Sequence, residues 1–240
     1  MVDMYNNIVE TGKYPEEINL GILIPLQKPC KTDNLRPISN LVRKILSIIM
    51  LNRINNKLDK EISCSQTAYR DGRSTTENVY VCKTLVEKAL VSNNFDCHLL
   101  FLDMNKAFDS VKRNLLLEDL KQVVSSDELH ILSLLIQDVN IRVRNGSELG
   151  SKFETNLGIP QGDCLSPILF TFFLVNSLKE QNETSSTAKD CNCLTKQPSK
   201  DLNTAQQFAD DLNYISSSLS KINDKKECHR KVKKEKSYNK

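Results

Sequence analysis

The chain has 240 residues, with 33 Lys and Arg against 30 Asp and Glu and a formal net charge of +3. Hydrophobic residues make up 39% and charged residues 26%, a globular composition that excludes a disordered or fibrous chain. Because no run of about eighteen apolar residues occurs, the sequence predicts no membrane span and no membrane partner.

The positive charge is concentrated at one end of the chain. Residues 221–240 hold 9 basic and 3 acidic residues, whereas the other 220 residues hold 24 basic and 27 acidic ones. The body of the chain is therefore slightly acidic, and the net charge alone is no argument for a nucleic-acid partner. We expect segment 221–240 to be a disordered basic tail.

Eight cysteines are spread along the chain, and the N-terminus lacks the basic and apolar regions of a secretory signal. The sequence therefore predicts an intracellular protein with reduced thiols, in either the nucleus or the cytoplasm. Cys191, Cys193, Cys228 and His229 are candidate zinc ligands, although their spacing matches no standard zinc pattern. The alternative is that the cysteines are scattered small hydrophobic residues.

The first part of the chain alternates between apolar segments and polar loops. Residues 21–26 form a short apolar run typical of a strand, and a polar loop follows at 28–40. Apolar residues then recur at helical spacing over 40–62. A second helix is expected to be capped by Thr75 or Thr76. Its predicted apolar face consists of Val79, Cys82, Leu85, Val86 and Leu90.

Residues 97–103 form a nearly continuous apolar run that ends in Asp103, which is the pattern of a strand buried on both faces. The elements predicted after it are, in order, helices from about Val111 and over 127–138, a hairpin over 140–156 that turns at Asn145-Gly146, and an apolar helix over 164–179.

The segment after these helices is polar. Residues 180–204 are nearly devoid of large apolar side chains, which predicts a loop or a disordered insertion. Residues 205–218 regain strand character on both sides of Asp210 and Asp211. A strand, a tight turn and a second strand are therefore expected there.

Carboxylates thus stand at the ends or turns of two apolar segments, with Asp103 in one and Asp210 and Asp211 in the other. A buried carboxylate is costly unless a cation or hydrogen bonds balance it. Converging carboxylates repel one another unless a divalent metal lies between them, and oxygen-rich sites of this kind suit Mg²⁺. Taken singly, each aspartate is more simply explained as a turn or cap residue.

A segment rich in glycine and proline lies between the two carboxylate segments. It runs over 158–170 as GIPQGDCLSPILF and leads into the predicted apolar helix. Glycines in such a loop allow the backbone to approach a ligand closely. This weakens the explanation of the aspartates as isolated turn residues.

Five sequence blocks, taken in order, resemble the reverse transcriptase domain of retroelements, and most of all that of non-LTR retrotransposons. They are IPLQKP with LRPISN, SQTAYRDGRSTTENV, FLDMNKAFDSV, GIPQGDCLSPILF and FADD. FADD alone is a weak signal, whereas five blocks in the right order over residues 21–218 are a specific one.

The resemblance implies an α+β fold, a right-hand polymerase with fingers and palm whose antiparallel palm sheet is backed by the helices near 111–122 and 164–179. No thumb motif is recognisable after Asp211 and no endonuclease block precedes Gly21, so the resemblance suggests a truncated chain. The expected parts are an N-terminal segment 1–20, fingers 21–95, palm 96–126 with the first carboxylate motif, a helix and hairpin of fingers or palm 127–156, palm 157–220 with the insertion 180–204, and the tail 221–240.

The resemblance also implies roles for residues of this sequence. Asp103, Asp210 and Asp211 would hold two catalytic Mg²⁺ ions, which Mn²⁺ can replace, together with the backbone carbonyl of Met104. Asp109 would instead cap or orient the next helix.

Further residues match positions that contact the substrates in this family. Phe108 matches the bulky residue that excludes the ribose 2′-hydroxyl, and Gln161 and Gly162 match the platform under the nucleotide. Two basic pairs also match: Lys28 and Arg36 as fingers residues near the triphosphate, and Arg70 and Arg73 as residues of template contact or fingers packing.

The implied function is RNA-directed DNA polymerisation by two-metal nucleotidyl transfer, with an RNA template, a DNA primer and deoxynucleoside triphosphates as partners. A missing thumb, or the rest of a longer polyprotein, would complete the enzyme. The main alternative is a truncated, non-catalytic remnant with at most nucleic-acid binding. An RNA-templated RNA polymerase is a third hypothesis, which Ala107-Phe108 and the FADD turn disfavour.

Overall fold

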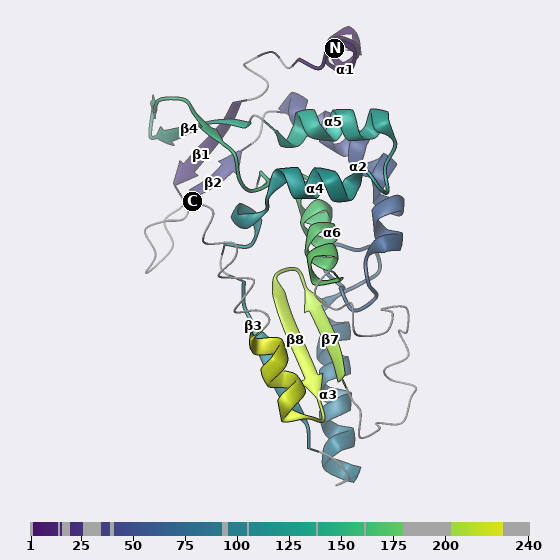
Figure 1. Ribbon diagram of the computed structural model, residues 1–240. Helices are drawn as coiled ribbons and strands as arrows, with labels where there is room; N and C mark the ends of the chain where they lie inside the picture. The colour runs from purple at the N-terminus through teal and green to yellow at the C-terminus, as the bar shows by residue number, and fades with distance from the viewer. Residues whose placement is uncertain are drawn as a thin grey trace. The chain divides into compact units, whose positions relative to one another are not determined.

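The structure is a computed structural model in which residues 2–13, 15, 20–25, 35–38, 41–92, 96–104, 106–137, 139–160, 162–179 and 203–227 are described. Helices and strands are mixed along the chain, as the sequence predicts (Figure 1). The chain divides into two compact units, each made of two segments. Unit 1 comprises residues 1–61 and 108–173, and unit 2 comprises residues 62–107 and 174–240.

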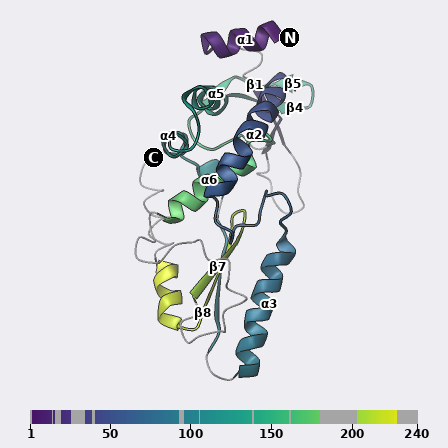
Figure 2. The ribbon, with the colours of Figure 1, turned by 90° about the vertical axis from the view of Figure 1, so that its right-hand side faces the viewer.

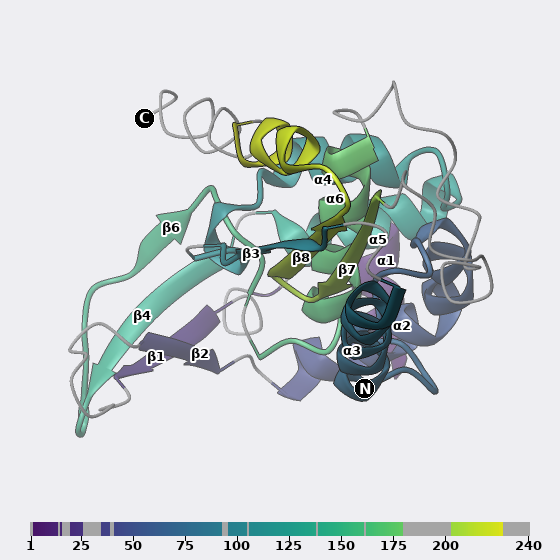
Figure 3. The ribbon, with the colours of Figure 1, turned by 90° about the horizontal axis from the view of Figure 1, so that it is seen from below.

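A five-stranded mixed sheet organises unit 1. Its strands are β1 (Leu20–Pro25), β2 (Leu35–Ile38), β4 (Val139–Asn145), β5 (Glu148–Leu149) and β6 (Phe153–Thr155). The order is β2-β1-β4-β5, with β6 also paired to β4. The long strand β4 runs parallel to β1 and antiparallel to β6, as can be followed in Figure 3.

The β4–β5 hairpin confirms the turn predicted at Asn145-Gly146, where Gly146 has a left-handed φ of 62°. Strand β2, in contrast, falls inside the segment predicted to be a polar loop. It pairs antiparallel with β1, from Ile22 opposite Ile38 to Pro25 opposite Leu35. Its four residues carry no alternating pattern of their own, and pairing with β1 is what makes them a strand.

Four helices belong wholly to the described part of unit 1. Helices α2 (Leu41–Glu61) and α4 (Arg113–Leu120) lie where helical spacing predicts them, whereas α1 (Val2–Thr11) is an addition. Helix α5 (Ser126–Ile136) begins one residue earlier than predicted because Ser125 forms a capping box with Glu128. The Ser125 Oγ accepts from the Glu128 N–H, and the Glu128 carboxylate accepts from the Ser125 N–H.

A three-stranded antiparallel sheet organises unit 2, in the order β3-β8-β7. Its strands are β3 (His98–Leu102), β7 (Asn203–Phe208) and β8 (Asp211–Ser216). Helix α3 (Thr75–Ser92) lies beside this sheet, as both Figure 1 and Figure 2 show. Val81 and Leu85 of α3 pack on Ile215 of β8 to form the local core.

Two burial predictions in unit 2 are wrong. Strand β3 is at the edge of its sheet, and its side chains alternate in exposure, so that Phe101 is 66% exposed instead of buried on both faces. Helix α3 turns Val81, Leu85 and Ala89 inward and leaves Val79 and Leu90 exposed. A narrow sheet covers only one i, i+4 row of the helix, and an apolar run by itself does not say which row that is.

The structure also differs from the expectations for the C-terminal tail and for one cysteine. Residues 219–227 form a helix, whereas disorder was expected from 221 onward. Cys64 is disulfide-bonded instead of reduced, whereas Cys82, Cys97 and Cys164 are free thiols as expected. Residues 180–202 and the four candidate zinc ligands lie outside the described residues. Among the helices that are described, none has the length and apolar character needed to cross a membrane.

The capping box of α5 generates a pH prediction. Glu128 is buried, and the hydrogen bond from the Lys57 ammonium at 2.6 Å is the main cause that lowers its pKa below the ordinary value of 4.5. A lowered pKa in the folded state gives stability above the unfolded pKa and loses it as pH falls through the folded pKa. The Glu128→Gln variant should therefore unfold with a free energy about 1–2 kcal/mol lower at pH 7.

Urea unfolding at pH 7 and near pH 3.5 measures this difference, which should shrink at the lower pH. Glu118→Gln is the matched control, because Glu118 is an exposed glutamate on the neighbouring helix α4. An equal deficit at both pH values would show that the ionised carboxylate is not what stabilises the helix start.

Candidate active site

The double aspartate lies on a tight hairpin in unit 2. Strands β7 and β8 pair up to Phe208 opposite Asp211, so Ala209 and Asp210 alone form the turn. Ala209 has a left-handed φ of 53°. An L-residue with a side chain pays about 1–2 kcal/mol in that region, and glycine is the usual residue there. The turn that carries Asp210 is therefore held against a local conformational cost.

The neighbouring strand brings the third carboxylate to this hairpin. Strand β3 pairs antiparallel with β8, ending at Leu102 opposite Leu212. The next position outward along this register sets Asp103 opposite Asp211. Asp103 and the double aspartate thus sit at the same end of adjacent strands. Met104 follows Asp103 directly and is half-buried.

The three carboxylates act on one another. The pKa of Asp210 is raised above its ordinary value, first by burial and then by the negative charges of Asp211 and Asp103, while a backbone hydrogen bond opposes the shift. Mutual repulsion of this kind favours a cation at the site. Within the described residues, however, no three His, Cys, Asp or Glu side chains are already gathered closely enough to hold a metal ion.

Strained backbone collects around these carboxylates. Among the described residues other than glycine, positive φ angles occur at Ala209, at Tyr69 (58°) and at Lys106 (50°), three residues beyond Asp103. Burial raises the pKa of Tyr69, and the negative charge of Asp210 raises it further, so the Tyr69 hydroxyl interacts electrostatically with Asp210. Strained backbone in proteins clusters at functional sites.

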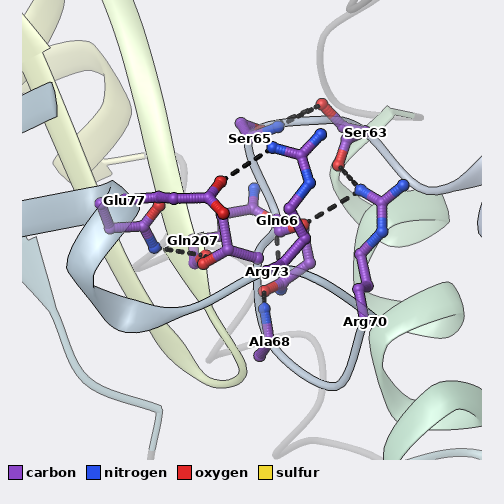
Figure 4. Close-up of polar contacts among 10 residues, drawn as sticks. Ser63, Ser65, Gln66, Ala68, Arg70, Arg73, Glu77 and Gln207 are labelled. Atoms are coloured by element: carbon purple, nitrogen blue, oxygen red, sulfur yellow. Dashed lines mark hydrogen bonds and ion pairs between the residues drawn. The ribbon is translucent and has the colours of Figure 1, made fainter.

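The loop before α3 and the first turn of α3 bind the hairpin along strand β7, at its other edge (Figure 4). The Thr67 N–H donates to the Gln207 carbonyl at 3.1 Å, and the Asn78 amide donates to the same carbonyl at 2.8 Å. The buried Gln66 side chain reaches the turn itself, at Ala209. Neither Gln66 nor Asn78 is assigned a role by the sequence pattern, although both lie within the block SQTAYRDGRSTTENV.

Arg70 and Arg73 stabilise the loop that carries them. The Arg70 guanidinium donates to the carbonyl oxygens of Ser63 at 2.9 Å and Gln66 at 3.1 Å, and Arg73 pairs with Glu77 at 2.8 Å on the surface (Figure 4). These contacts hold both side chains to their own loop and the start of α3. A role in fingers packing and contact with a template both stay predictions.

The glycine-rich segment belongs to unit 1, where Gly158 makes a close approach to another loop. Gly158 has a φ of 80°, and a Cβ atom there would lie 2.9 Å from the Cα of Asp109. The Gly158 N–H donates to the Val111 carbonyl at 2.9 Å, and the Ile159 N–H donates to the Phe108 carbonyl at 3.1 Å. The segment is thereby joined to the chain that follows the first carboxylate motif.

Two buried arginines hold the first half of this segment. Arg113 donates from Nε to the Gly158 carbonyl at 2.6 Å and also binds the carbonyls of Thr155 and Leu157. Further along the segment, buried Asp163 accepts from Ser47 at 3.0 Å and from the Leu165 N–H at 3.1 Å. It also faces the Arg43 guanidinium at 3.5 Å, with both side chains 4% exposed. None of these side chains was identified from the sequence.

Phe108 and Gly162 belong to unit 1 with this segment. The Phe108 ring stacks on Phe170 with centroids 4.4 Å apart, and Gly162 is exposed with a φ of 86°. Asp109 does not cap helix α4, whose N-cap residue is Lys112. The remaining predicted substrate contacts are less fully described: Lys28 and Gln161 lie outside the described residues, and Arg36 lies in β2.

Comparison with known proteins assigns the family. Residues 26–239 match the family described as reverse transcriptase (RNA-dependent DNA polymerase). Because the match covers most of the chain, the protein belongs to the reverse transcriptase family. Its similarity to polymerases of transposable elements places it with the non-LTR retrotransposon type.

Two relatives illustrate this similarity. The chain is 26% identical over 178 residues to the probable RNA-directed DNA polymerase from transposon BS of Drosophila melanogaster, covering 71% of this chain and 20% of that protein. It is 27% identical over 198 residues to the RNA-directed DNA polymerase from mobile element jockey of Drosophila funebris, covering 79% of this chain and 21% of that protein. The chain spans about a fifth of the length of these relatives.

A solved structure shares the fold. Apo telomerase from Candida tropicalis matches with a TM-score of 0.57 at 11% identity, over 94% of this chain and 45% of that one. At this level of identity the likeness concerns the fold alone.

The close approach at Gly158 predicts a large effect of a single methyl group. Gly158→Ala should lower the free energy of unfolding by about 2–4 kcal/mol, because the Cβ both opposes the positive φ and meets the Asp109 backbone. Gly146→Ala is the control: it has the same kind of φ, 62°, and open space around its Cβ. It should cost only about 1 kcal/mol in urea unfolding. Equal losses in the two variants would mean that the contact with Asp109 is not tight.

Proposed function

We propose that this chain is the fingers and palm of an RNA-directed DNA polymerase that copies an RNA template from a DNA primer. One observation carries the proposal: the β3–β8 register, which sets Asp103 opposite Asp211 beside the Asp210 turn. We assign residues 21–95 to fingers, 96–126 and 157–220 to palm, and 127–156 to a helix and hairpin of either.

We propose that Asp103, Asp210 and Asp211 hold the catalytic Mg²⁺ ions, with the Met104 carbonyl as a further oxygen. The donor set fits, because it is made of hard oxygen ligands. Burial, and after it the negative charges of Asp211 and Asp103, raise the pKa of Asp210, and a cation would offset both effects. The side chains would have to close in further, together with substrate phosphates, because the described residues hold no ready cluster of three ligands. Two bound divalent ions would activate the primer hydroxyl and neutralise the triphosphate.

We further propose that Phe108, Gln161 and Gly162 contact the incoming nucleotide. The Phe108 ring is half-buried and stacked on Phe170, so it is a rigid wall suited to exclude a 2′-hydroxyl. The exposed Gly162 has no side chain to keep a nucleotide away from its backbone. Lys28 and Arg36 would bind the triphosphate, as basic side chains suited to phosphate.

Template and primer would be held mainly through their phosphates. Arg73 is exposed, and Arg70 is fixed to its own loop, so both can present positive charge beside the carboxylate hairpin of unit 2. Contacts of this kind make binding depend steeply on salt. We propose an intracellular site of action, where such a template is found.

Primer extension with Mg²⁺ on an RNA template tests this function. The Asp210→Asn variant should lose more than about a hundredfold in rate, since even groups that only orient metal ligands are worth about 10–100-fold. Asp103→Asn should behave alike, whereas Asp96→Asn should not, because Asp96 is an exposed aspartate at the other end of β3. If the folded wild-type chain extends no primer, the chain is a non-catalytic remnant and the proposal fails for it.

Asp210→Asn also has an expected effect on stability that separates folding from chemistry. A folded-state pKa that is raised means that the ionised carboxylate opposes folding above its unfolded pKa. Without divalent ions at pH 7, the variant should therefore be no less stable than the wild type in thermal unfolding. A lower melting temperature would mean that Asp210 supports the fold, and that lost activity says little about metal binding.

Discrimination between nucleotides tests Phe108. Phe108→Ala should raise incorporation of ribonucleotides relative to deoxynucleotides by about tenfold or more, because removing a bulky wall is worth about 1–3 kcal/mol of discrimination. Steady-state kcat/KM for each nucleotide measures the ratio. Phe170→Ala removes the stacking partner but keeps the Phe108 ring. If it reduces discrimination between the nucleotides as much as Phe108→Ala does, the Phe108 ring serves packing instead of selection.

A further inference from the structure

One buried side-chain amide holds the backbone of the carboxylate turn on both sides. The Gln66 Oε1 accepts from the Ala209 N–H at 3.1 Å, and the Gln66 Nε2 donates to the Ala209 carbonyl at 3.2 Å. Gln66 is 0% exposed and Ala209 is 5% exposed. The amide therefore pairs with Ala209 as a peptide group of an adjacent strand would.

The turn needs such a partner. Ala209 lies outside the β7–β8 ladder, which ends at Phe208 opposite Asp211. A buried N–H and a buried carbonyl without partners would each be costly, and the φ of 53° adds to the cost. The Gln66 amide satisfies both groups at the residue directly before Asp210.

The amide is itself fixed in place. Its Oε1 also accepts from the Ala68 N–H at 3.1 Å. The side chain therefore cannot leave Ala209 without losing this third hydrogen bond as well. Gln66 and Gln207 form a parallel β-bridge, in which the Gln207 N–H donates to the Ser65 carbonyl at 2.9 Å. Figure 4 shows Gln66 beside Gln207, within the loop that carries Arg70 and Arg73. Backbone pairing on one side and amide pairing on the other make a rigid bracket.

We propose that Gln66 is a positioning residue for the metal site: it locks the Ala209 turn and thereby fixes the direction of the Asp210 carboxylate. The inference rests on the proposed function, in which Asp210 binds a catalytic ion. Gln66 touches neither ion nor substrate in this proposal, and acts only through the backbone of Ala209.

Manganese binding by the full 240-residue chain tests the proposal without requiring polymerase activity. Free Mn²⁺ is followed by electron paramagnetic resonance as protein is titrated. Gln66→Met keeps the length of the side chain but removes its hydrogen bonds to Ala209 and to the Ala68 N–H. It should weaken Mn²⁺ binding by about tenfold, equivalent to about 1.4 kcal/mol. The Ala209 amide proton should exchange with solvent faster by a similar factor.

Asn78→Leu is the matched control. It removes the 2.8 Å hydrogen bond from the Asn78 amide to the Gln207 carbonyl. Gln207 lies in β7, two residues before Ala209. The loss of stability should be smaller than that of Gln66→Met, which removes more hydrogen bonds, and Mn²⁺ binding should stay within about twofold of wild type. If Asn78→Leu weakens Mn²⁺ binding as much as Gln66→Met does, general destabilisation explains both and the proposal is overturned.

A second background keeps the test decisive if Gln66→Met alone does not fold. Ala209→Gly removes the cost of the left-handed φ, and with Gln66 in place it should bind Mn²⁺ within about twofold of wild type. The double variant Gln66→Met/Ala209→Gly should fold and still bind about tenfold more weakly. Equal binding by the single glycine variant and the double variant would refute the role of Gln66.

Mn²⁺ binding by Asp210→Asn and Gln66→Met distinguishes an error about the metal site from an error about the role of Gln66. If Asp210→Asn binds Mn²⁺ as tightly as wild type, the proposed metal site is wrong, and Gln66 has no such site to position. If Asp210→Asn loses binding but folded Gln66→Met does not, the metal site stands and the role of Gln66 is wrong.

Discussion

The antiparallel pairing of β3 with β8 is the interaction on which the candidate site depends. Asp103 and Asp210 are separated by more than a hundred residues, and the register from His98 to Leu102 against Ser216 to Leu212 is what brings their carboxylates together. A slip by one residue would turn every side chain of β3 to the other face and move Asp103 away from Asp211. The register is supported by burial on β8, where Leu212, Tyr214 and Ile215 are all covered.

Buried polar side chains that bind backbone groups support both functional segments. In unit 2, Gln66 and Asn78 hold the hairpin of the double aspartate through Ala209 and Gln207. In unit 1, Arg113 holds the start of the glycine-rich segment and the Arg43–Asp163 pair holds its middle. Such loops have little apolar surface of their own to bury, so hydrogen bonds from buried side chains are what fix their shape.

The sequence allowed the main helices, the two hairpins and the positions of the three aspartates to be predicted, because each depends on a local pattern. Helical spacing marks α2, and Asn145-Gly146 marks a turn whatever surrounds it. Strand β2 and the exposed face of β3 could not be predicted in this way, since each follows from which neighbour is present in the sheet. The same holds for α3, where the three-stranded sheet selects the row through Val81 and Leu85.

The supporting residues of the site were missed for a related reason. Gln66 and Arg113 are polar, and a single polar residue in a sequence is far more often a surface residue than a buried brace. Their roles depend on the backbone groups they meet, which lie 143 positions away for Gln66 and 45 for Arg113. Asp163 was predicted only as a member of its motif, since nothing local indicates its buried arginine partner.

The site combines two features that each oppose folding, and their coincidence is itself an argument for function. Like charges meet at Asp210, Asp211 and Asp103, and the turn residue Ala209 takes a conformation that glycine would adopt more easily. A structure under no functional demand would be more stable with a neutral side chain in place of Asp210. The buried Gln66 side chain instead stabilises this arrangement through its hydrogen bonds to Ala209, and a divalent ion would offset the remaining repulsion. The arrangement is therefore unfavourable while the carboxylates are unneutralised, and it would become favourable at the proposed metal site.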